Sequence, residues 1–277
     1  MNQRVTLNRA LSKLGYGSRT QALDWIRNGL VKVDGKTCTN PLEWVDLKLQ
    51  DIELKDTQKP KQNTIALLLH KPPGYVTTRD DELSRPTVFD LLPPDLGYLF
   101  PAGRLDFESQ GLLLFSNDSL ITNLLTDPSH KIDKTYLVTI RGQLTPESLH
   151  QLRNGIKLNQ KATQPCKVKV LQDNSESSIL EFILNEGLNR QIRKMIHAVG
   201  SKVRKLVRTK IGTLTLEGIE PGKFRLLSPT EIQKLQQRQN YACNARLIRN
   251  SASFDANAIR TKDSTTLGED ECRLASL

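Results

Sequence analysis

Apolar residues recur at helical spacing near the start of the chain, where two short helices and a hairpin are expected. Ser18 and Gln21 stand in the order of a capping box, which predicts that a second helix opens at this point. Two strands joined by a tight turn should follow, over residues 30–33 and 36–38. The first helix is marked by four apolar residues spaced three and four positions apart: Leu7, Ala10, Leu11 and Leu14. We expect these elements to form one compact unit over residues 1–54.

A larger region follows, and the polar residues 55–63 are expected to be the linker that leads to it. Short apolar or alternating runs predict strands at 65–69, 112–115, 136–140, 166–171, 179–184 and 214–216. Helical patterns predict helices at 120–126, 146–153, 189–199 and 229–236. Because no regular strand–helix–strand rhythm appears, the expected fold class of residues 64–240 is α+β, with a mixed, largely antiparallel sheet and flanking helices. Residues 241–277 lose this periodicity and are expected to be a disordered tail.

Charge narrows the choice of partner. The 277 residues include 40 Lys or Arg against 30 Asp or Glu, a formal net charge of +10. Such an excess favours nucleic acid or an anionic membrane as partner, and no apolar run reaches the roughly 18 residues of a membrane helix. RNA is therefore favoured over a membrane. On the N-terminal unit, Arg9, Arg19 and Lys32 are candidate RNA contacts, with a merely solvated polar surface as the alternative.

A second basic segment spans residues 190–210, which contain eight Lys or Arg and no Asp or Glu. Apolar residues such as Ile192, Met195 and Val203 are interleaved with these charges. We therefore expect the segment to be folded, with its basic side chains on the exposed side as a further RNA footprint.

Several kinds of chemistry are not indicated. The four cysteines are scattered without a Cys-x-x-Cys pair, and the four histidines are equally dispersed, so we expect reduced thiols and no metal site. The polar first residues lack the apolar core of a secretory signal, which favours the cytoplasm. The stretch GIEPGK at residues 218–223 is one residue short of a phosphate loop, and no dinucleotide, nucleophile-elbow or zinc-protease motif occurs. No cofactor is expected.

One short stretch raises the question of catalysis. GRLDFESQGLLLFSND, residues 103–118, places Asp106 directly ahead of an apolar strand. By itself such an aspartate is more often a turn or capping residue than a nucleophile. Three other segments change this interpretation: HKPPGYVTT at 70–78, KTYLVTI at 134–140, and NEGLNRQIRKMIHAVGSKVRKLVRTKIG at 185–212.

Together, in this order, the four segments resemble the bacterial ribosomal-RNA pseudouridine synthases of the RsuA/RluB/RluE/RluF family. The SQG sequence after Asp106, the GLNRQIRKM run and the CKVKV strand look most like the RluF branch. LNRALSKLGYGSRTQALDWIRNGLVKVDGK, residues 7–36, also resembles the αL RNA-binding domain first described in a small-subunit ribosomal protein. The chain departs from the family at Ser119, where a glycine usually closes the turn.

The resemblance implies a reaction and roles for particular residues. The family converts uridine in RNA to pseudouridine without a cofactor, and its RLD aspartate, here Asp106, is the nucleophile. Arg193 corresponds to the arginine that holds this carboxylate ionised, and Tyr136 to the tyrosine that stacks on the uracil. The target uridine must be flipped out of folded RNA, and Arg104 matches the residue that helps to occupy the vacated space.

Three further residues receive weaker assignments. Leu206 matches an apolar residue of the pocket floor, although ordinary core packing is the default for a leucine. Arg190 and Lys194 are expected to face RNA or solvent, because both lie nearly opposite the apolar stripe of their predicted helix.

The leading hypothesis is a monomeric enzyme that isomerises uridine in large-subunit ribosomal RNA, with transfer RNA as a second substrate to be tested. One alternative is a non-catalytic RNA-binding or ribosome-assembly factor on the same scaffold. The other is a glycoside hydrolase with Asp106 and Glu108 as its carboxylate pair, which the low aromatic content of 5% and the basic charge disfavour. The particular uridine, the atom that Asp106 attacks and the role of the tail are not indicated by the sequence.

Overall fold

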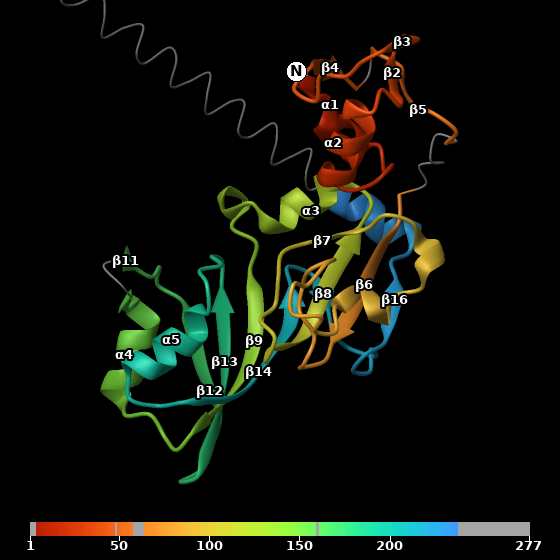
Figure 1. Ribbon diagram of the computed structural model, residues 1–277. Coiled ribbons are helices and arrows are strands. Elements are labelled where there is room, and N and C mark those ends of the chain that lie inside the picture. The colour runs from red at the N-terminus through yellow and green to blue at the C-terminus, as the bar shows by residue number, and fades with distance from the viewer. Residues whose placement is uncertain (1–3, 48, 58–63, 159–160, 238–277) are drawn as a thin grey trace, which may run out of the picture.

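The computed structural model describes residues 4–47, 49–57, 64–158 and 161–237 (Figure 1). A small N-terminal unit precedes a larger unit built on one extended sheet. The expected tail at 241–277 and most of the expected linker at 55–63 lie outside the described residues. The domain boundaries drawn from the sequence therefore stay predictions.

The N-terminal unit contains the two expected helices, α1 (Leu7–Lys13) and α2 (Arg19–Arg27). The capping box is confirmed, because the Gln21 backbone N–H donates to Ser18 Oγ at 3.1 Å and the Ser18 N–H donates to Gln21 Oε1 at 2.9 Å. Strands surround the helices: β1 (Arg4–Thr6), β2 (Val31–Val33), β3 (Lys36–Thr37), β4 (Trp44–Asp46) and β5 (Ile52–Leu54). Strands β1, β4 and β5 were not expected from the sequence, because each has only three residues and, unlike β2 and β3, no tight turn joins it to a partner strand.

The larger unit is organised by a nine-stranded sheet in the order β12-β13-β9-β14-β8-β6-β16, with β15 beside β14 and β7 beside β8. Its strands are β6 (Ala66–Lys71), β7 (Phe100–Pro101), β8 (Gln110–Ser116), β9 (Lys134–Arg141), β12 (Lys167–Asp173), β13 (Ser177–Leu184), β14 (Val203–Ile211), β15 (Leu214–Thr215) and β16 (Phe224–Leu226). All neighbours pair antiparallel except β8 and β14, which are parallel. The expected mixed, largely antiparallel sheet is confirmed.

Helices and short turns cover this sheet. They are α3 (Ser119–Thr126), α4 (Pro146–Asn154) and α5 (Gln191–Ala198), the 3-10 turns η1 (Val88–Leu91), η2 (Pro94–Leu96) and η3 (Pro128–His130), and the small hairpin β10 (Lys157–Leu158) with β11 (Lys161–Ala162). Residues 229–237 are also helical, and Ser228 and Glu231 form the capping contacts expected there. Figure 1 shows α4 and α5 beside the β12–β13–β9 half of the sheet and α3 near β7 and β8.

The two halves of the sheet bury their apolar residues differently. Strands β6 and β8 are buried on both faces, because alternate leucines enter two separate clusters, with Leu112 and Leu114 in one and Leu113 with Phe115 in the other. In the other half, one face packs against α4 and α5 through residues such as Phe182 and Met195. Each such fully buried side chain contributes about 1.5–3 kcal/mol relative to an exposed one. Each half of the sheet is thus stabilised by its own apolar clusters, and the two halves meet at a single junction.

The junction is the parallel pairing of β8 with β14. Arg208 lies opposite Gly111, and Gly111 has φ +114°. A Cβ atom at Gly111 would lie 2.3 Å from the Arg208 carbonyl oxygen, so only glycine permits this approach. On its other side Arg208 lies opposite Tyr136 of β9. The junction therefore brings the loop that carries Asp106 next to β9 and β14.

Strand β14 corrects the interpretation of the basic segment. The expected helix at 189–199 spans only Gln191–Ala198, because Arg190 adopts a left-handed conformation with φ 52° and ψ 35°. Residues Val203–Ile211 form strand β14, which was not expected from the sequence. Its pairing with β9 shifts register between Arg208 and Lys210, and this shift interrupts the alternation of buried and exposed residues. The extra residue, Thr209, forms a bulge. Arg208 is only 4% exposed, so the basic side chains do not all lie on the surface.

The close approach at Gly111 generates a test of stability. Gly111→Ala should lower the free energy of unfolding by about 3 kcal/mol or more, because it adds a backbone clash to the cost of a positive φ. Gly218→Ala is the matched control, with φ +75° but no atom within 4 Å of the added Cβ, and should cost about 1–2 kcal/mol. Chemical denaturation of both variants measures the difference, and equal costs would mean that the approach at Gly111 is not a constraint.

Candidate active site

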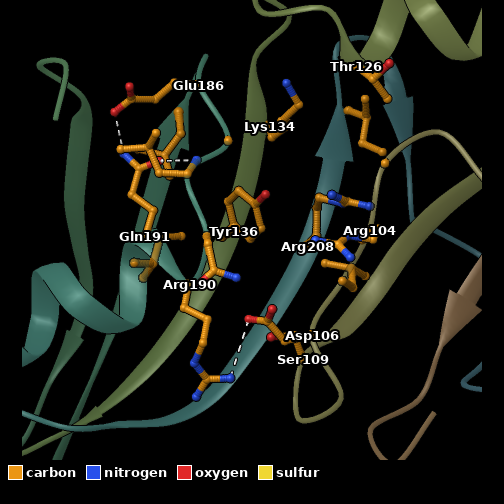
Figure 2. A pocket seen from close by; sticks show the side chains of 18 of the residues that line it. Arg104, Asp106, Ser109, Thr126, Lys134, Tyr136, Glu186, Arg190, Gln191 and Arg208 are labelled. Carbon is orange, nitrogen blue, oxygen red and sulfur yellow. Dashed lines mark hydrogen bonds and ion pairs between the residues drawn. The ribbon is translucent and has the colours of Figure 1, made fainter. Parts of the chain in front are cut away.

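A cavity of about 260 Å³ lies between the loop before β8, strands β9 and β14, and the segment that leads into α5 (Figure 2). Asp106 lies where this cavity adjoins a second one of about 620 Å³. Five residues identified in the sequence line the first cavity: Arg104, Asp106, Tyr136, Arg190 and Leu206. Motifs that are up to 102 residues apart in the chain thus converge on one site.

The loop around Asp106 is held by hydrogen bonds to its backbone. Thr77 Oγ1 donates to the Leu105 carbonyl at 2.9 Å, and the Leu105 N–H donates back to Thr77 Oγ1 at 3.3 Å. The Ser109 N–H donates to the Asp106 carbonyl at 3.0 Å, which closes a turn. The Asp106 carboxylate itself is left 30% exposed at the cavity. The loop is therefore fixed through its backbone while the reactive candidate faces outward.

Lys71 fastens the same loop from inside. Its side chain is completely buried at the end of β6, and Nζ donates to the carbonyls of Ser109 at 2.7 Å, Pro72 at 3.0 Å and Phe107 at 3.4 Å. Burial lowers the pKa of Lys71 from 10.5 to about 8, against the opposing effect of the Asp106 charge. The HKPPG turn was recognisable from the sequence but the role of this lysine was not, although a charged residue that closes an apolar strand was the available signal.

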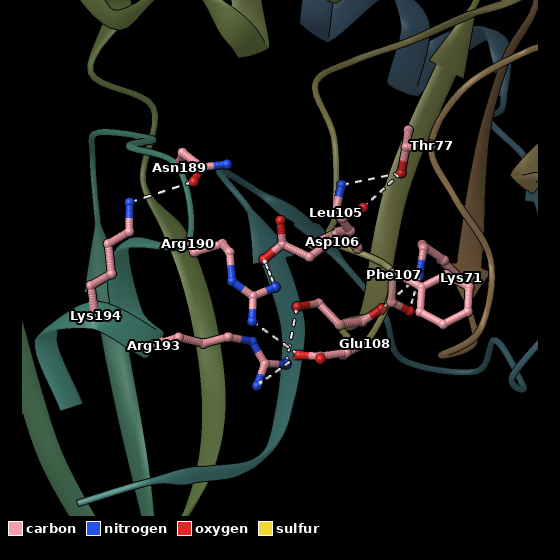
Figure 3. Close-up of polar contacts among 11 residues, drawn as sticks. Lys71, Thr77, Leu105, Asp106, Phe107, Glu108, Asn189, Arg190, Arg193 and Lys194 are labelled. Atoms are coloured by element: carbon pink, nitrogen blue, oxygen red, sulfur yellow. Dashed lines mark hydrogen bonds and ion pairs between the residues drawn. The ribbon is translucent and has the colours of Figure 1, made fainter. Parts of the chain in front are cut away.

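The ion pairs around Asp106 differ from the implied arrangement (Figure 3). Arg190, rather than Arg193, forms the ion pair with Asp106, with Nη1 3.8 Å from Oδ2. Arg193 lies 3.5 Å from Glu108 Oε2 and donates to Ser109 Oγ at 3.4 Å. The left-handed conformation of Arg190 is the physical reason, because it places this residue before the helix and beside the loop. A catalytic role for Arg193 stays a prediction.

Glu108 occupies the position between the two arginines. Arg190 Nη2 lies 3.1 Å from Glu108 Oε2, and the hydrogen bond from Arg190, followed by the charge of Arg193, lowers the pKa of the Glu108 carboxyl. Arg193 is largely buried, and this burial lowers the pKa of its guanidinium, which Glu108 opposes. Arg193 therefore ties α5 to the loop that carries Asp106.

Tyr136 and Leu206 form the wall on the side of the sheet. Tyr136 is half-buried on β9, and Leu206 is 6% exposed on β14 and belongs to the cluster of α4 and α5. Leu206 also lines the cavity, so the two interpretations offered for it, pocket floor and core, describe the same position.

Two basic residues of the cavity were not identified from the sequence. Arg208 is buried on β14, and its Nε donates to the Leu112 carbonyl at 2.8 Å. Lys134 at the start of β9 has its pKa lowered by burial and then by the charge of Arg208. The signal for Arg208 was its place in the KLVRTKIG motif, two residues after Leu206, which puts both side chains on one face of a strand.

The remaining candidates lie away from the cavity. Lys194 is exposed on α5, where Nζ donates to Asn189 Oδ1 at 3.5 Å. Arg9, Arg19 and Lys32 are exposed on the N-terminal unit. Burial lowers the pKa of nearby Lys13, and the charges of Arg9 and Arg19 lower it further.

Among the described residues, no group of His, Cys, Asp and Glu is arranged to hold a metal ion, and no helix is long and apolar enough to cross a membrane.

Comparisons with known proteins agree with this arrangement. Residues 65–198 match the family model described as RNA pseudouridylate synthase, and residues 5–42 match the S4 domain. The chain is 34% identical over 244 residues to ribosomal large subunit pseudouridine synthase B of Bacillus subtilis, covering 86% of this chain and 98% of that protein. An uncharacterised RNA pseudouridine synthase of Aquifex aeolicus is 34% identical over 241 residues, with 86% and 98% covered.

A solved structure supports the same relationship. A crystal structure of a pseudouridylate synthase matches 83% of this chain and 99% of that chain, with 30% sequence identity and a TM-score of 0.61. The finer expectation of membership in the RluF branch stays a prediction, because the similarities extend to a large-subunit synthase of type B.

The lowered pKa of the buried Lys71 predicts how the free energy of unfolding depends on pH. The folded state holds the Lys71 proton less tightly than the unfolded chain, so between about pH 8 and 10.5 unfolding takes up protons. The free energy of unfolding of the wild type should therefore rise relative to that of Lys71→Met as the pH rises through this range. Denaturation at pH 7.5 and 9.5 measures the change.

The matched control is Lys36→Met, which removes an exposed lysine from β3 and should change stability by no more than about 0.5 kcal/mol. A constant difference between wild type and Lys71→Met at both pH values would contradict the lowered pKa.

Proposed function

This chain belongs to the family of RNA pseudouridine synthases, which are isomerases that act on RNA, and we propose that its substrate is a uridine in large-subunit ribosomal RNA. The similarity to the large-subunit synthase of Bacillus subtilis supports this substrate, as does the basic N-terminal unit that matches the S4 domain. We include transfer RNA as a second candidate substrate. The proposed enzyme acts as a monomer in the cytoplasm.

The proposed reaction exchanges one bond for another within the nucleotide. The N-glycosidic bond of uridine breaks, the uracil turns while it remains in the pocket, and a carbon–carbon bond to the ribose forms. The bonding carbon of the uracil loses its proton, and the freed ring nitrogen takes one up. Atoms and electrons balance without a co-reactant, because the product is an isomer of the substrate. A carboxylate can serve as the nucleophile for such a displacement.

Asp106 is the proposed nucleophile, and its position carries the proposal. Its carboxylate is partly exposed at the cavity, its loop is held through the backbone, and Arg190 lies close enough to counter its charge. A nucleophile placed on a fixed loop needs little rearrangement to meet a bound substrate.

The size and walls of the cavity suit one extruded base. A nucleotide in folded RNA reaches an enzyme pocket only after it flips out of the stack. Tyr136 is the proposed stacking partner on the wall formed by β9. Arg104 and Arg190 are exposed at the cavity, where they can contact the RNA backbone or occupy the vacated space.

The arrangement disfavours the alternative of a glycoside hydrolase. Its carboxylate pair would be Asp106 and Glu108, yet Glu108 is bound by two arginines and is not among the residues that line either cavity around Asp106. A second carboxylate directed at the same bond is what such hydrolysis requires.

The test of the proposed nucleophile is Asp106→Asn. On unmodified large-subunit ribosomal RNA, the wild type should introduce pseudouridine, detected as reverse-transcription stops after carbodiimide treatment. Asp106→Asn should lower this activity by about 10³-fold or more while RNA binding is retained, because the amide is a poor nucleophile.

The matched control is Asp95→Asn, which makes the same change at an exposed aspartate of η2 and should retain activity. Activity that survives in Asp106→Asn would overturn the assignment. Parallel reactions with unmodified transfer RNA test the second substrate.

Substitution of Arg193 and substitution of Arg190 are expected to affect different kinetic constants. Arg193 holds both Glu108 and Ser109, so Arg193→Met should loosen the loop that carries Asp106 and lower kcat by about 10- to 100-fold. Arg190→Met removes a more exposed cation and should mainly raise KM, with a shallower dependence of binding on salt. Steady-state kinetics at two salt concentrations separate these effects, and a larger fall in kcat for Arg190→Met would reverse the assignment.

A further inference from the structure

Arg208 presents a buried donor for which the described residues supply no partner. The residue is 4% exposed, and its Nε is used in the hydrogen bond to the Leu112 carbonyl. Its Nη2 atom is buried and makes no hydrogen bond within the part of the chain that the structure describes. Such unpaired groups are rare, because leaving a buried charged donor unsatisfied costs free energy. A fixed, unpaired donor of this kind points to a ligand.

The surroundings of Arg208 identify the place where that ligand would lie. Arg208 lines the cavity that contains Asp106 and is the cross-strand neighbour of Tyr136 (Figure 2). Its backbone is held against Gly111, so the side chain starts from a fixed point. The cavity wall beside it is apolar, with Leu206 and Ile211 on the same strand. An acceptor in this low-dielectric setting would gain more from the guanidinium than it would at the surface.

The depth of Arg208 decides which part of a nucleotide can reach it. A phosphodiester is joined to the chain on both sides, so it must stay near the mouth, where Arg104 and Arg190 are exposed. The flipped base is the part that enters the pocket. Uracil offers two carbonyl oxygens as acceptors, at positions 2 and 4.

We propose that Nη2 of Arg208 donates a hydrogen bond to a carbonyl oxygen of the target uracil, which makes Arg208 a base-recognition residue. This inference rests on the proposed function in one respect, namely that the cavity beside Asp106 receives the substrate base. A donor at this point binds a base with a carbonyl oxygen there more tightly than a base with an amino group there, such as cytosine at position 4.

The test pairs one change in the protein with one change in the substrate. Short RNAs that contain the target uridine are prepared with uridine, 4-thiouridine or 2-thiouridine at that position, because sulfur is a weak hydrogen-bond acceptor. For the wild type, one of the two analogues should lower kcat/KM by about 10- to 100-fold, the range expected for a hydrogen bond from a charged donor. In Arg208→Gln the same analogue should cost less than about 3-fold, since the contact is already lost.

The matched control is Arg204→Gln, which removes an exposed arginine from the same strand and should keep the full analogue penalty of the wild type. A purely structural role for Arg208 would lower kcat/KM for all three RNAs equally, and that result would overturn the proposal. A coupling that appears instead with a methylphosphonate on the 5′ side of the target would assign the contact to phosphate and would also overturn it.

Two further measurements keep the outcome decisive. If Arg208→Gln does not fold, Arg208→Met, which also lacks the charged donor, replaces it. A wild type indifferent to both thio-analogues rejects the proposal without any variant. Dissociation constants for the same RNAs are measured beside the rates. A wild type that is inactive but binds the uridine RNA at least 10-fold more tightly than one analogue would refute the proposed reaction while supporting the contact.

Discussion

The approach of Gly111 to Arg208 is the constraint on which the rest of the site depends. The sheet consists of two halves with separate cores, and they meet where β8 runs parallel to β14. No side chain fits between the two backbones at this point. Because the cavity forms beside this junction, residues from both halves face one another across it: Asp106 comes from the loop before β8, and Tyr136 and Arg208 come from β9 and β14.

Electrostatics around the cavity follow from how each charge is held. Lys71 donates hydrogen bonds to backbone carbonyl groups from the interior. Its ammonium group is therefore not bonded to the Asp106 carboxylate, which stays available to a substrate. Glu108 draws Arg190 and Arg193 to the outer side of the same loop. The loop is thus braced by cations on both sides, and its one carboxylate at the cavity lies between them. Positive charge near a developing or resident anion is the usual means of stabilising it in an active site.

The sequence predicted the elements whose pattern is local. It did not predict the positions of side chains that depend on tertiary contacts. The capping boxes at Ser18 and Ser228, the helices of the N-terminal unit and most strands of the larger sheet depend on spacing, and they were confirmed. The position of Arg190 beside Asp106 depends on one left-handed residue, which no periodicity reveals. Arg208 was hidden in a basic run, because the burial of a charged side chain depends on strands far away in the chain. The four motifs located the cavity, but the contacts within it required the structure.

The bulge at Thr209 decides which residue of β14 completes the cavity wall. Side chains alternate along a strand, so Leu206 and Arg208 face the cavity and Lys210 would be the next in phase. The extra residue resets the alternation, and the apolar Ile211 takes that position opposite Lys134, while Lys210 is exposed. A strand that ran through the same residues without the bulge would instead turn Lys210 toward the cavity, so the bulge keeps an apolar residue in this wall. The irregular backbone of this strand is therefore as much a determinant of the pocket as its composition.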